Sequence, residues 1–230
     1  MYAVKIFTLY PEIFPGLLAG GIYGKAMRNG LWSLKTVNIR DYADDKHKTV
    51  DDTVFGGGSG MLMKPDIVAN SLDKNISKGE KIFYLSPKGK KFNQSFANSL
   101  SKQNGINLIC GHFEGVDDRL LSTRNIEEIS IGDYVLSGGE TAAFVILDAV
   151  LRLIPGVLGN KDSIKDETFE NSLLEYPQFT KPKIWEGKSV PEVLFSGDHA
   201  KIKSWRLSQS EDITRRQRPD LWEKYLKDKK

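Results

Sequence analysis

Three short segments hold most of the glycines and polar groups that could do chemistry in this sequence. They read LSPKGKKF (85–92), GHFEGVDDR (111–119) and GDYVLSGGE (132–140). Glycines allow a ligand to approach the main chain closely, and main-chain N–H and C=O groups can hydrogen-bond a small polar molecule. If the three segments meet in space, they predict a pocket that binds a small molecule mainly through the backbone.

Each segment also has a purely structural interpretation. Ser137 and Glu140 have the spacing of a capping box for the helix that follows, and Asp117 is placed to cap a helix that starts at Asp118. Taken singly, each segment is better explained by its structural role than by ligand binding. Only their combination favours a binding site.

Motifs for other chemistries fail on spacing. No GxGxxG follows a predicted strand, and the glycine-rich run 55–62 lacks the spacing of a dinucleotide or phosphate loop, so it predicts a mobile loop. Gly187-Lys188-Ser189 resembles the end of a phosphate loop, but Pro182 stands where that motif needs glycine. The three histidines are scattered and Cys110 is the single cysteine, so we predict no metal site.

Short β-rich runs alternate with helical stretches along the first two thirds of the chain. The runs are 3–9, 32–39, 81–85, 106–110 and 126–131, and helix candidates lie at 65–75 and 93–103. This alternation predicts a mainly parallel α/β sheet. Each of the three segments directly follows a β-run, at the side where open α/β sheets bind ligands.

The chain changes character after the apolar stretch 141–154. That stretch is shorter than a bilayer span and contains Asp148 and Arg152, so it predicts a buried helix. The polar run 159–172 has no apolar periodicity and predicts a linker between a domain at 1–158 and a smaller one at 173–230. In a helix over 199–216, Ile202, Trp205 and Ile213 would share one side.

Charge and composition narrow the class of protein. Residues 196–230 contain ten basic and six acidic residues, a local charge of +4 in a chain of net +3. Such a tail suits phosphate binding, although charge taken alone is better explained by a solvated helical face. The composition, 40% hydrophobic and 27% charged, is that of a globular protein. One cysteine and no recognisable signal segment favour the cytoplasm, with no membrane association.

The three segments, taken with others, closely resemble the bacterial tRNA guanine-N1 methyltransferase family. The matching motifs run in order along nearly the whole chain: LYPEIF, VFGGGSGMLMKP, YLSPKGKKF, CGHFEGVDDR, IGDYVLSGGE, RLIPGVLGN, LLEYPQFTKP and GDHAKIKSWRLSQS. The resemblance implies the SPOUT-type fold, a trefoil-knotted, mainly parallel α/β sheet with a small, mostly helical C-terminal domain that binds tRNA. It also implies methylation of the guanosine immediately 3′ of the anticodon.

The methyl donor implied by the resemblance is S-adenosylmethionine, held largely by backbone groups. The residues implied to bind it are Tyr84, Leu85, Ser86, Pro87, Gly111, Glu114, Gly115, Ile131, Gly132, Asp133, Tyr134, Val135, Leu136, Gly138 and Gly139. Of these, Glu114 has the alternative of a solvent-facing turn carboxylate.

Methylation of guanine N1 requires a base, because the neutral nitrogen carries a proton and is a poor nucleophile. By resemblance the base lies in the linker just before the Thr168-Phe169 pair. The family has an aspartate there, whereas register here gives Glu167 this role, with Asp166 the alternative. Arg152 is implied to stabilise the charge that develops on O6.

The resemblance further implies a homodimer with composite active sites and a divalent cation such as magnesium. Two alternatives stay open at this point. One keeps the fold and the methyl donor but changes the RNA base that accepts the methyl group. The other is a noncatalytic RNA-binding protein whose glycine-rich segments are structural.

Overall fold

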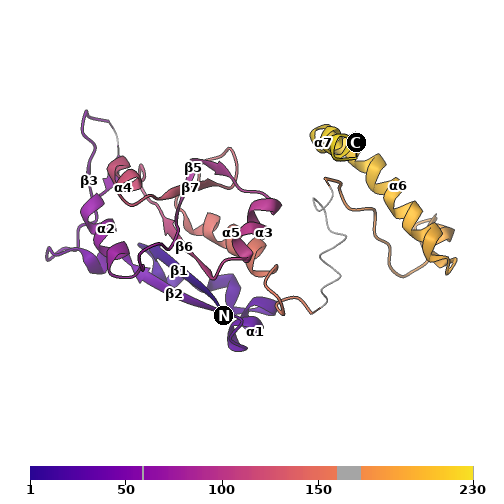
Figure 1. Ribbon diagram of the computed structural model, residues 1–230, viewed down its shortest axis with the longest axis horizontal. Helices are drawn as coiled ribbons and strands as arrows, with labels where there is room; N and C mark the ends of the chain where they lie inside the picture. The colour runs from indigo at the N-terminus through magenta and orange to yellow at the C-terminus, as the bar shows by residue number, and fades with distance from the viewer. Residues whose placement is uncertain (59, 160–171, 230) are drawn as a thin grey trace. The chain divides into compact units, whose positions relative to one another are not determined.

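The structure is a computed structural model that describes residues 1–58, 60–159 and 172–229. The chain divides into two compact units, Met1–Gly159 and Asn160–Lys230, which are described separately below (Figure 1).

A parallel sheet forms the centre of the first unit. Its strands are β1 (Tyr2–Thr8), β2 (Trp32–Asn38), β5 (Ile82–Lys91), β6 (Gly105–Cys110) and β7 (Glu127–Ser130). They lie in the order β2-β1-β6-β5-β7, and each neighbouring pair is parallel. The predicted α/β class and all five predicted β-runs are therefore confirmed. The three strands that precede the glycine-containing segments are neighbours in the sheet.

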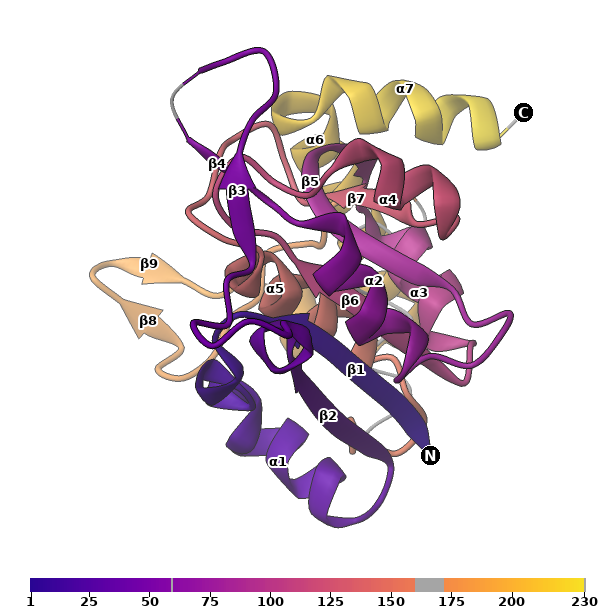
Figure 2. The same ribbon diagram turned by 90° about the vertical axis from the view of Figure 1, so that its left-hand side faces the viewer.

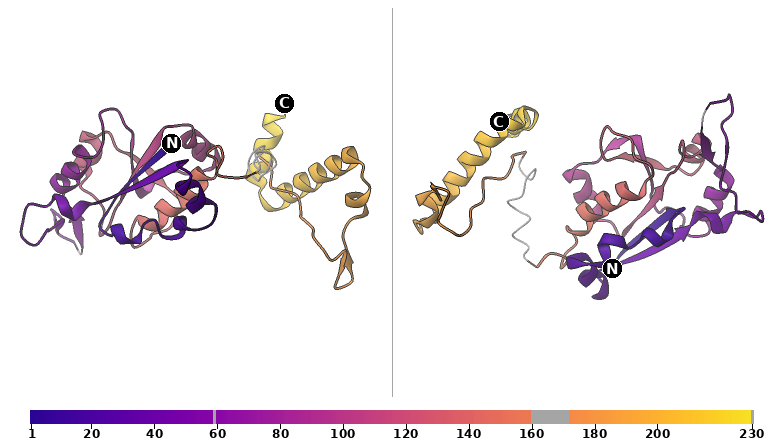
Figure 3. Two further views of the ribbon diagram at one scale, coloured as in Figure 1. Left: turned by 90° about the horizontal axis from the view of Figure 1, so that it is seen from below. Right: turned by 180° about the vertical axis from the view of Figure 1, so that it is seen from behind.

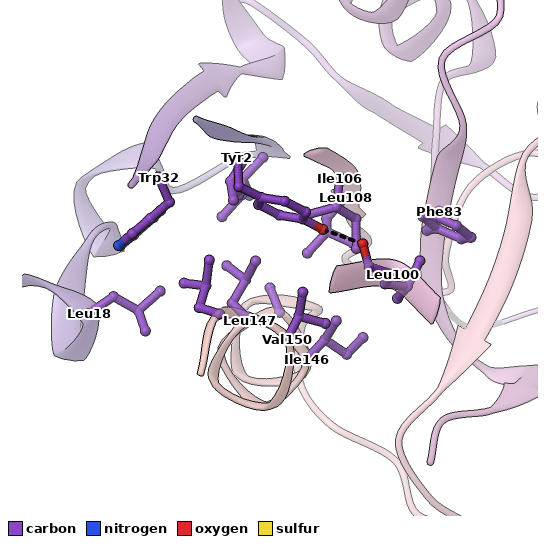
Figure 4. Packing of buried hydrophobic residues seen from close by; sticks show 14 of the residues in the cluster. Tyr2, Leu18, Trp32, Phe83, Leu100, Ile106, Leu108, Ile146, Leu147 and Val150 are labelled. Carbon is purple, nitrogen blue, oxygen red and sulfur yellow. Dashed lines mark hydrogen bonds between the residues drawn. The ribbon is translucent and has the colours of Figure 1, made fainter. Parts of the chain in front are cut away.

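Helices cover both faces of this sheet (Figure 2). On one face are α1 (Gly21–Arg28), α3 (Gln94–Ser101) and α5 (Glu140–Leu151); on the other are α2 (Pro65–Asp73) and α4 (Asp118–Thr123). Adjacent strand residues point to opposite layers, so Ile6 packs with the first cluster and Phe7 with the second. The first core joins Tyr2 and Trp32 to Leu147 of α5, and the Tyr2 hydroxyl donates to the Leu100 carbonyl (Figure 4).

Local sequence signals set the starts of several helices. Pro65 occupies the first turn of α2, the Asn93 side chain accepts from the Phe96 N–H to cap α3, and Asp117 accepts from the Arg119 N–H to cap α4. The predictions at Pro65 and Asp117 are confirmed. The stretch predicted as a buried helix is α5, in which Ala143, Ile146, Leu147, Val150 and Leu151 are fully enclosed.

The glycine-rich run 55–62 differs from its prediction as a simple loop. It ends in a strand, because β3 (Asp51–Thr53) and β4 (Met61–Met63) form an antiparallel hairpin. The strand forms because it has partners on both sides: the Met63 N–H donates to the Gly115 carbonyl, and the Glu114 N–H donates to the Met61 carbonyl, each at 2.9 Å. Sequence alone does not show these partners. Short 3₁₀ turns lie at Pro11–Ile13, Gly16–Ala19 and Ile39–Tyr42.

The described part of the second unit is built on two helices, α6 (His199–Gln217) and α7 (Pro219–Asp228) (Figure 3). A small hairpin of β8 (Ile184–Trp185) and β9 (Lys188–Ser189) and a 3₁₀ turn at Glu192–Phe195 precede them. The Asp198 side chain caps α6 by accepting from the N–H groups of Ala200 and Lys201. Ile202, Trp205 and Ile213 are all half-buried along α6, as its predicted apolar side requires.

Among the described residues, no helix combines the length and apolar character needed to cross a bilayer.

Candidate ligand site

The segments after β5, β6 and β7 line one cavity of about 440 Å³. This volume lies within the roughly 300–1,000 Å³ usual for small-molecule sites. Fourteen of the fifteen residues predicted to bind a ligand line it: Tyr84, Leu85, Ser86, Pro87, Gly111, Glu114, Gly115, Ile131, Gly132, Tyr134, Val135, Leu136, Gly138 and Gly139. The predicted convergence of the three segments is confirmed.

The segment after β5 reaches the cavity because it leaves the sheet. Leu85 and Lys90 both pair with Ile129 of β7, so residues 86–89 bulge out of the ladder. Gly89 permits this: a Cβ there would lie 2.4 Å from the Ile129 nitrogen. Within the bulge the Lys88 N–H donates to the Ser86 hydroxyl at 3.2 Å. The bulge turns Ser86 and Pro87 toward the ligand side.

The segment after β6 is fixed between β4 and Tyr84. Besides its bonds to β4, Gly115 adopts φ +111°, a conformation that side chains rarely adopt. A Cβ on Gly111 would lie 2.6 Å from the Tyr84 ring, so both glycines allow this tyrosine to pack under the loop. Burial raises the pKa of the Tyr84 hydroxyl, which therefore stays neutral at physiological pH.

The segment after β7 supplies the apolar wall of the cavity. Its turn is held by Ser130, whose hydroxyl donates to the Gly132 carbonyl at 3.1 Å. Val135 at its tip is 86% exposed, and Tyr134 is also exposed. At the other end the Gly139 N–H donates to the Gly111 carbonyl at 3.0 Å. The exposed side chains thus belong to a segment whose two ends are anchored.

A buried polar cluster behind the cavity was not predicted from the sequence. Glu140 is enclosed, accepts a hydrogen bond from the Thr8 hydroxyl, and lies with both carboxylate oxygens 2.9 Å from Nε2 of His112. The Tyr10 ring packs edge-on against His112, with 4.9 Å between centroids. The cluster joins the end of β1 to the segments after β6 and β7. The sequence feature that could have indicated this cluster is Glu140, a charged residue at the start of an almost wholly apolar helix.

The capping box predicted at Ser137–Glu140 is wrong. The residue before α5 is Gly139, and no side chain caps this helix end. Glu140 does not take part in a capping box because its carboxylate binds Thr8 and His112, which are distant in sequence.

The charged groups that line the cavity are mainly acidic: Glu114, Asp118 and Glu128 against the single lysine Lys88. This balance favours a ligand that carries positive charge. Cys110 lies below the cavity floor, where burial and the neighbouring Glu140 raise the pKa of its thiol. A protonated thiol is a poor nucleophile, so the chemistry of this site does not use Cys110.

The remaining predicted residues lie elsewhere. Asp133 does not line the cavity; it is 89% exposed and 3.7 Å from the Lys91 ammonium. Arg152 follows the last residue of α5, whereas Glu140 begins that helix of 12 residues, so roughly 18 Å of helix separates Arg152 from the cavity end. Asp166 and Glu167 lie outside the described residues. In the described ranges, no three His, Cys, Asp or Glu side chains gather to hold a metal ion.

Comparison with known proteins relates this arrangement to one family. The family model described as tRNA (Guanine-1)-methyltransferase TrmD matches residues 2–224. The chain belongs to this family. Because the match runs from β1 into α7, tRNA (guanine-1)-methyltransferase family membership covers both units.

Curated family members are similar over their full lengths. A tRNA (guanine-N(1)-)-methyltransferase of Pelagibacter ubique (strain HTCC1062) is 72% identical over 227 residues, covering 99% of this chain and 100% of the relative. The proteins of the same description from Brucella canis and Bartonella henselae are 52% and 51% identical, covering 100% and 99% of this chain and 93% and 98% of theirs. The family resemblance inferred from the motifs is thereby confirmed.

Proposed function

We propose that this chain transfers a methyl group from S-adenosylmethionine to N1 of the guanosine immediately 3′ of the anticodon in tRNA. The proposal is supported mainly by the cavity that the segments after β5, β6 and β7 form together. The chain is also 72% identical to a curated tRNA (guanine-N(1)-)-methyltransferase. The enzyme is placed in the cytoplasm, where its tRNA substrate is found.

The cavity residues fit S-adenosylmethionine as the methyl donor. When bound, the donor supplies an electrophilic methyl group on a positively charged sulfur. Glu114 and Glu128 line the cavity and favour that charge, and Val135 and Leu136 offer an apolar wall for its adenine. The glycines bring main-chain groups within reach of its polar edges. In the family this binding segment belongs to a trefoil knot, which we propose for residues 84–140.

Proton removal from guanine N1 is assigned to the linker, with Glu167 as base and Asp166 as the alternative. Arg152 stabilises the charge that develops toward O6. Because Arg152 lies roughly 18 Å of helix from the cavity of its own subunit, it acts on the methyl donor bound by a second copy of the chain. This places each active site at the boundary of a homodimer.

An exposed apolar surface on the first unit supports the homodimer. Leu17 is 61% exposed, and Ile13, Ile22 and Val145 are each more than two-fifths exposed. Val145 belongs to α5, against which the turn containing Leu17 packs. Burying this patch against its own copy would remove apolar area from water and lay two α5 helices near one another.

The family resemblance also implies magnesium. Because the described residues offer no cluster of three ligating side chains, we assign the ion neither a site nor a step.

The proposed function is tested by methyl transfer to defined tRNA transcripts. Labelled S-adenosylmethionine is supplied with transcripts that carry, or lack, guanosine just 3′ of the anticodon. Label is expected only in the first, at N1 of that base. Equal labelling of both transcripts would contradict the proposed substrate, and binding of tRNA with no labelling of either would favour a noncatalytic RNA-binding role.

A Gly139→Ala substitution is expected to weaken S-adenosylmethionine binding and to lower the rate of methyl transfer on the order of a hundredfold, the scale of a 1 Å misplacement of reacting groups. The added Cβ would lie 2.6 Å from Cα of Cys110 and 3.0 Å from the Gly111 nitrogen, so the segment must move off the cavity floor. Isothermal titration calorimetry with the methyl donor measures the loss. Gly159→Ala is the matched control, because nothing lies within 4 Å of a Cβ there. Equal affinities of the two variants would contradict the proposed cavity.

A further inference from the structure

The second unit contains its own pocket, separate from the cavity that we assign to the methyl donor. It has a volume of about 480 Å³ and lies between the extended residues 176–183 and helix α6. Four aromatic side chains line it: Tyr176, Phe179, Phe195 and Trp205. The rings of Phe179 and Trp205 are tilted by 50° with 6.3 Å between centroids, and Phe179 remains 47% exposed. Aromatic faces that stay partly exposed in a hollow are suited to stacking on a flat ligand.

Three cations border the same pocket, and no carboxylate is among its lining residues. Lys183 lies over the Phe195 ring at 4.6 Å from its centroid, and Arg206 lies over the Tyr176 ring at 4.7 Å. Lys181 is the third. Within residues 172–229, no carboxylate lies at ion-pair distance from any of the three.

The rest of the basic tail is largely neutralised within its own helices. Arg215 and Arg216 both pair with Asp212, Arg218 pairs with Asp220, and Lys229 pairs with Glu211. The local charge of +4 in residues 196–230 is therefore not a uniform basic face. The aromatic pocket brings together three cations, Lys181, Lys183 and Arg206, that have no ion pair among the described residues.

We propose that this pocket binds one unpaired nucleotide of the RNA substrate, with its base on the aromatic walls and its phosphate at Lys181, Lys183 and Arg206. Single-stranded RNA is bound in this way, because each base has a face that stacks on aromatic rings and each phosphate carries a charge. Gln178 and Thr180 also line the pocket and provide side-chain hydrogen-bonding groups for a base edge. The inference rests on the proposed function for the identity of the RNA, not for the pocket chemistry.

The test is binding of a short single-stranded RNA, labelled with a fluorophore, to the full chain. Phe179→Ala is expected to raise its Kd about 5- to 150-fold, which corresponds to the ~1–3 kcal/mol of one stacked base. Lys183→Gln is expected to lower the slope of log K against log salt by about 0.7, the value for one phosphate of a single strand. Fluorescence anisotropy over a salt series measures both.

Matched controls separate the pocket from the unit as a whole. Trp185→Ala removes a more exposed aromatic side chain, and Lys203→Gln removes a cation from α6; neither residue lines the pocket, and both variants are expected to bind like wild type. Oligonucleotides that contain 5-bromouridine should photo-crosslink to the pocket aromatics, and a duplex of the same sequence should not.

Crosslinks that map outside residues 176–206, or equal binding by Phe179→Ala and Trp185→Ala, would overturn the inference. Methyl transfer by wild type with such results would leave the proposed function intact. Crosslinking at the pocket by a chain that transfers no methyl group would support the inference and contradict the proposed function. The inference would also be overturned if sedimentation showed a dimer formed through this pocket and RNA did not disrupt that dimer.

Discussion

A Glu167→Gln substitution is expected to lower the rate of methyl transfer to guanine N1 about 10²- to 10⁴-fold, the usual contribution of a positioned general base. Glutamine keeps the size of the side chain but cannot accept the N1 proton, so the guanine nitrogen stays a poor nucleophile. Binding of the methyl donor should be unchanged, because the residues proposed to hold it lie between 84 and 139. Single-turnover kinetics with saturating donor and a guanosine-containing transcript measure the effect.

Two neighbouring carboxylates provide the controls. Glu170→Gln removes a charge three residues away and should leave the rate within a few fold of wild type. Asp166→Asn decides between the two candidates, because a shift of the linker by one residue would transfer the role to Asp166. Full turnover by Glu167→Gln would show that the assignment of the base is wrong.

The sheet and the convergence of its loops could be predicted because both rest on short-range signals. The apolar run 106–110 is bounded by Asn104-Gly105 before and Gly111 after, and Asp117 marks the start of the helix that follows it. Parallel strands place their carboxyl ends on one edge of the sheet, so segments that follow β5, β6 and β7 must lie near each other once these strands are neighbours.

Features that depend on partners distant in sequence could not be predicted. β4 is three residues long and forms because the segment after β6 completes its hydrogen bonds, with Met63 bonded to Gly115, 52 residues further on. The bulge at 86–89 requires β7 to pair with both of its ends. Glu140 was interpreted from its local spacing as part of a capping box, whereas Thr8, 132 residues away, binds its carboxylate. In each case a tertiary contact decides between local alternatives.

The two pockets suggest how binding and chemistry are divided in the chain. The cavity of the first unit is acidic and glycine-lined, which suits a cationic methyl donor, whereas the pocket of the second unit is basic and aromatic, which suits RNA. Arg152 lines neither pocket, and Glu167 and Asp166, to which we assign proton removal, lie outside the described residues. The composite site that we propose would bring Arg152 of one subunit to the methyl donor bound by the other.

A Glu140→Ala substitution is expected to lower the free energy of unfolding of the first unit by about 1–3 kcal/mol for each buried group that loses its hydrogen-bond partner. The change leaves the Thr8 hydroxyl and His112 Nε2 without their carboxylate partner; the side chains of His112 and Glu140 are only 14% and 8% exposed. The segments that the cluster joins also wall the cavity, so methyl-donor affinity should fall with stability. Urea denaturation and calorimetric titration measure the two losses.

Further variants separate the effect of removing a carboxylate from the effect of leaving buried groups without a partner. Glu12→Ala removes an exposed carboxylate in the same unit and should change stability by less than about 0.5 kcal/mol. Removing both partners, in Glu140→Leu with His112→Phe, should cost less than Glu140→Ala, because only the Thr8 hydroxyl then loses its partner and apolar side chains replace the pair. If Glu140→Ala were as stable as Glu12→Ala, the cluster would not hold these segments, and the cavity would be anchored by its other hydrogen bonds, such as that from Gly139 to Gly111.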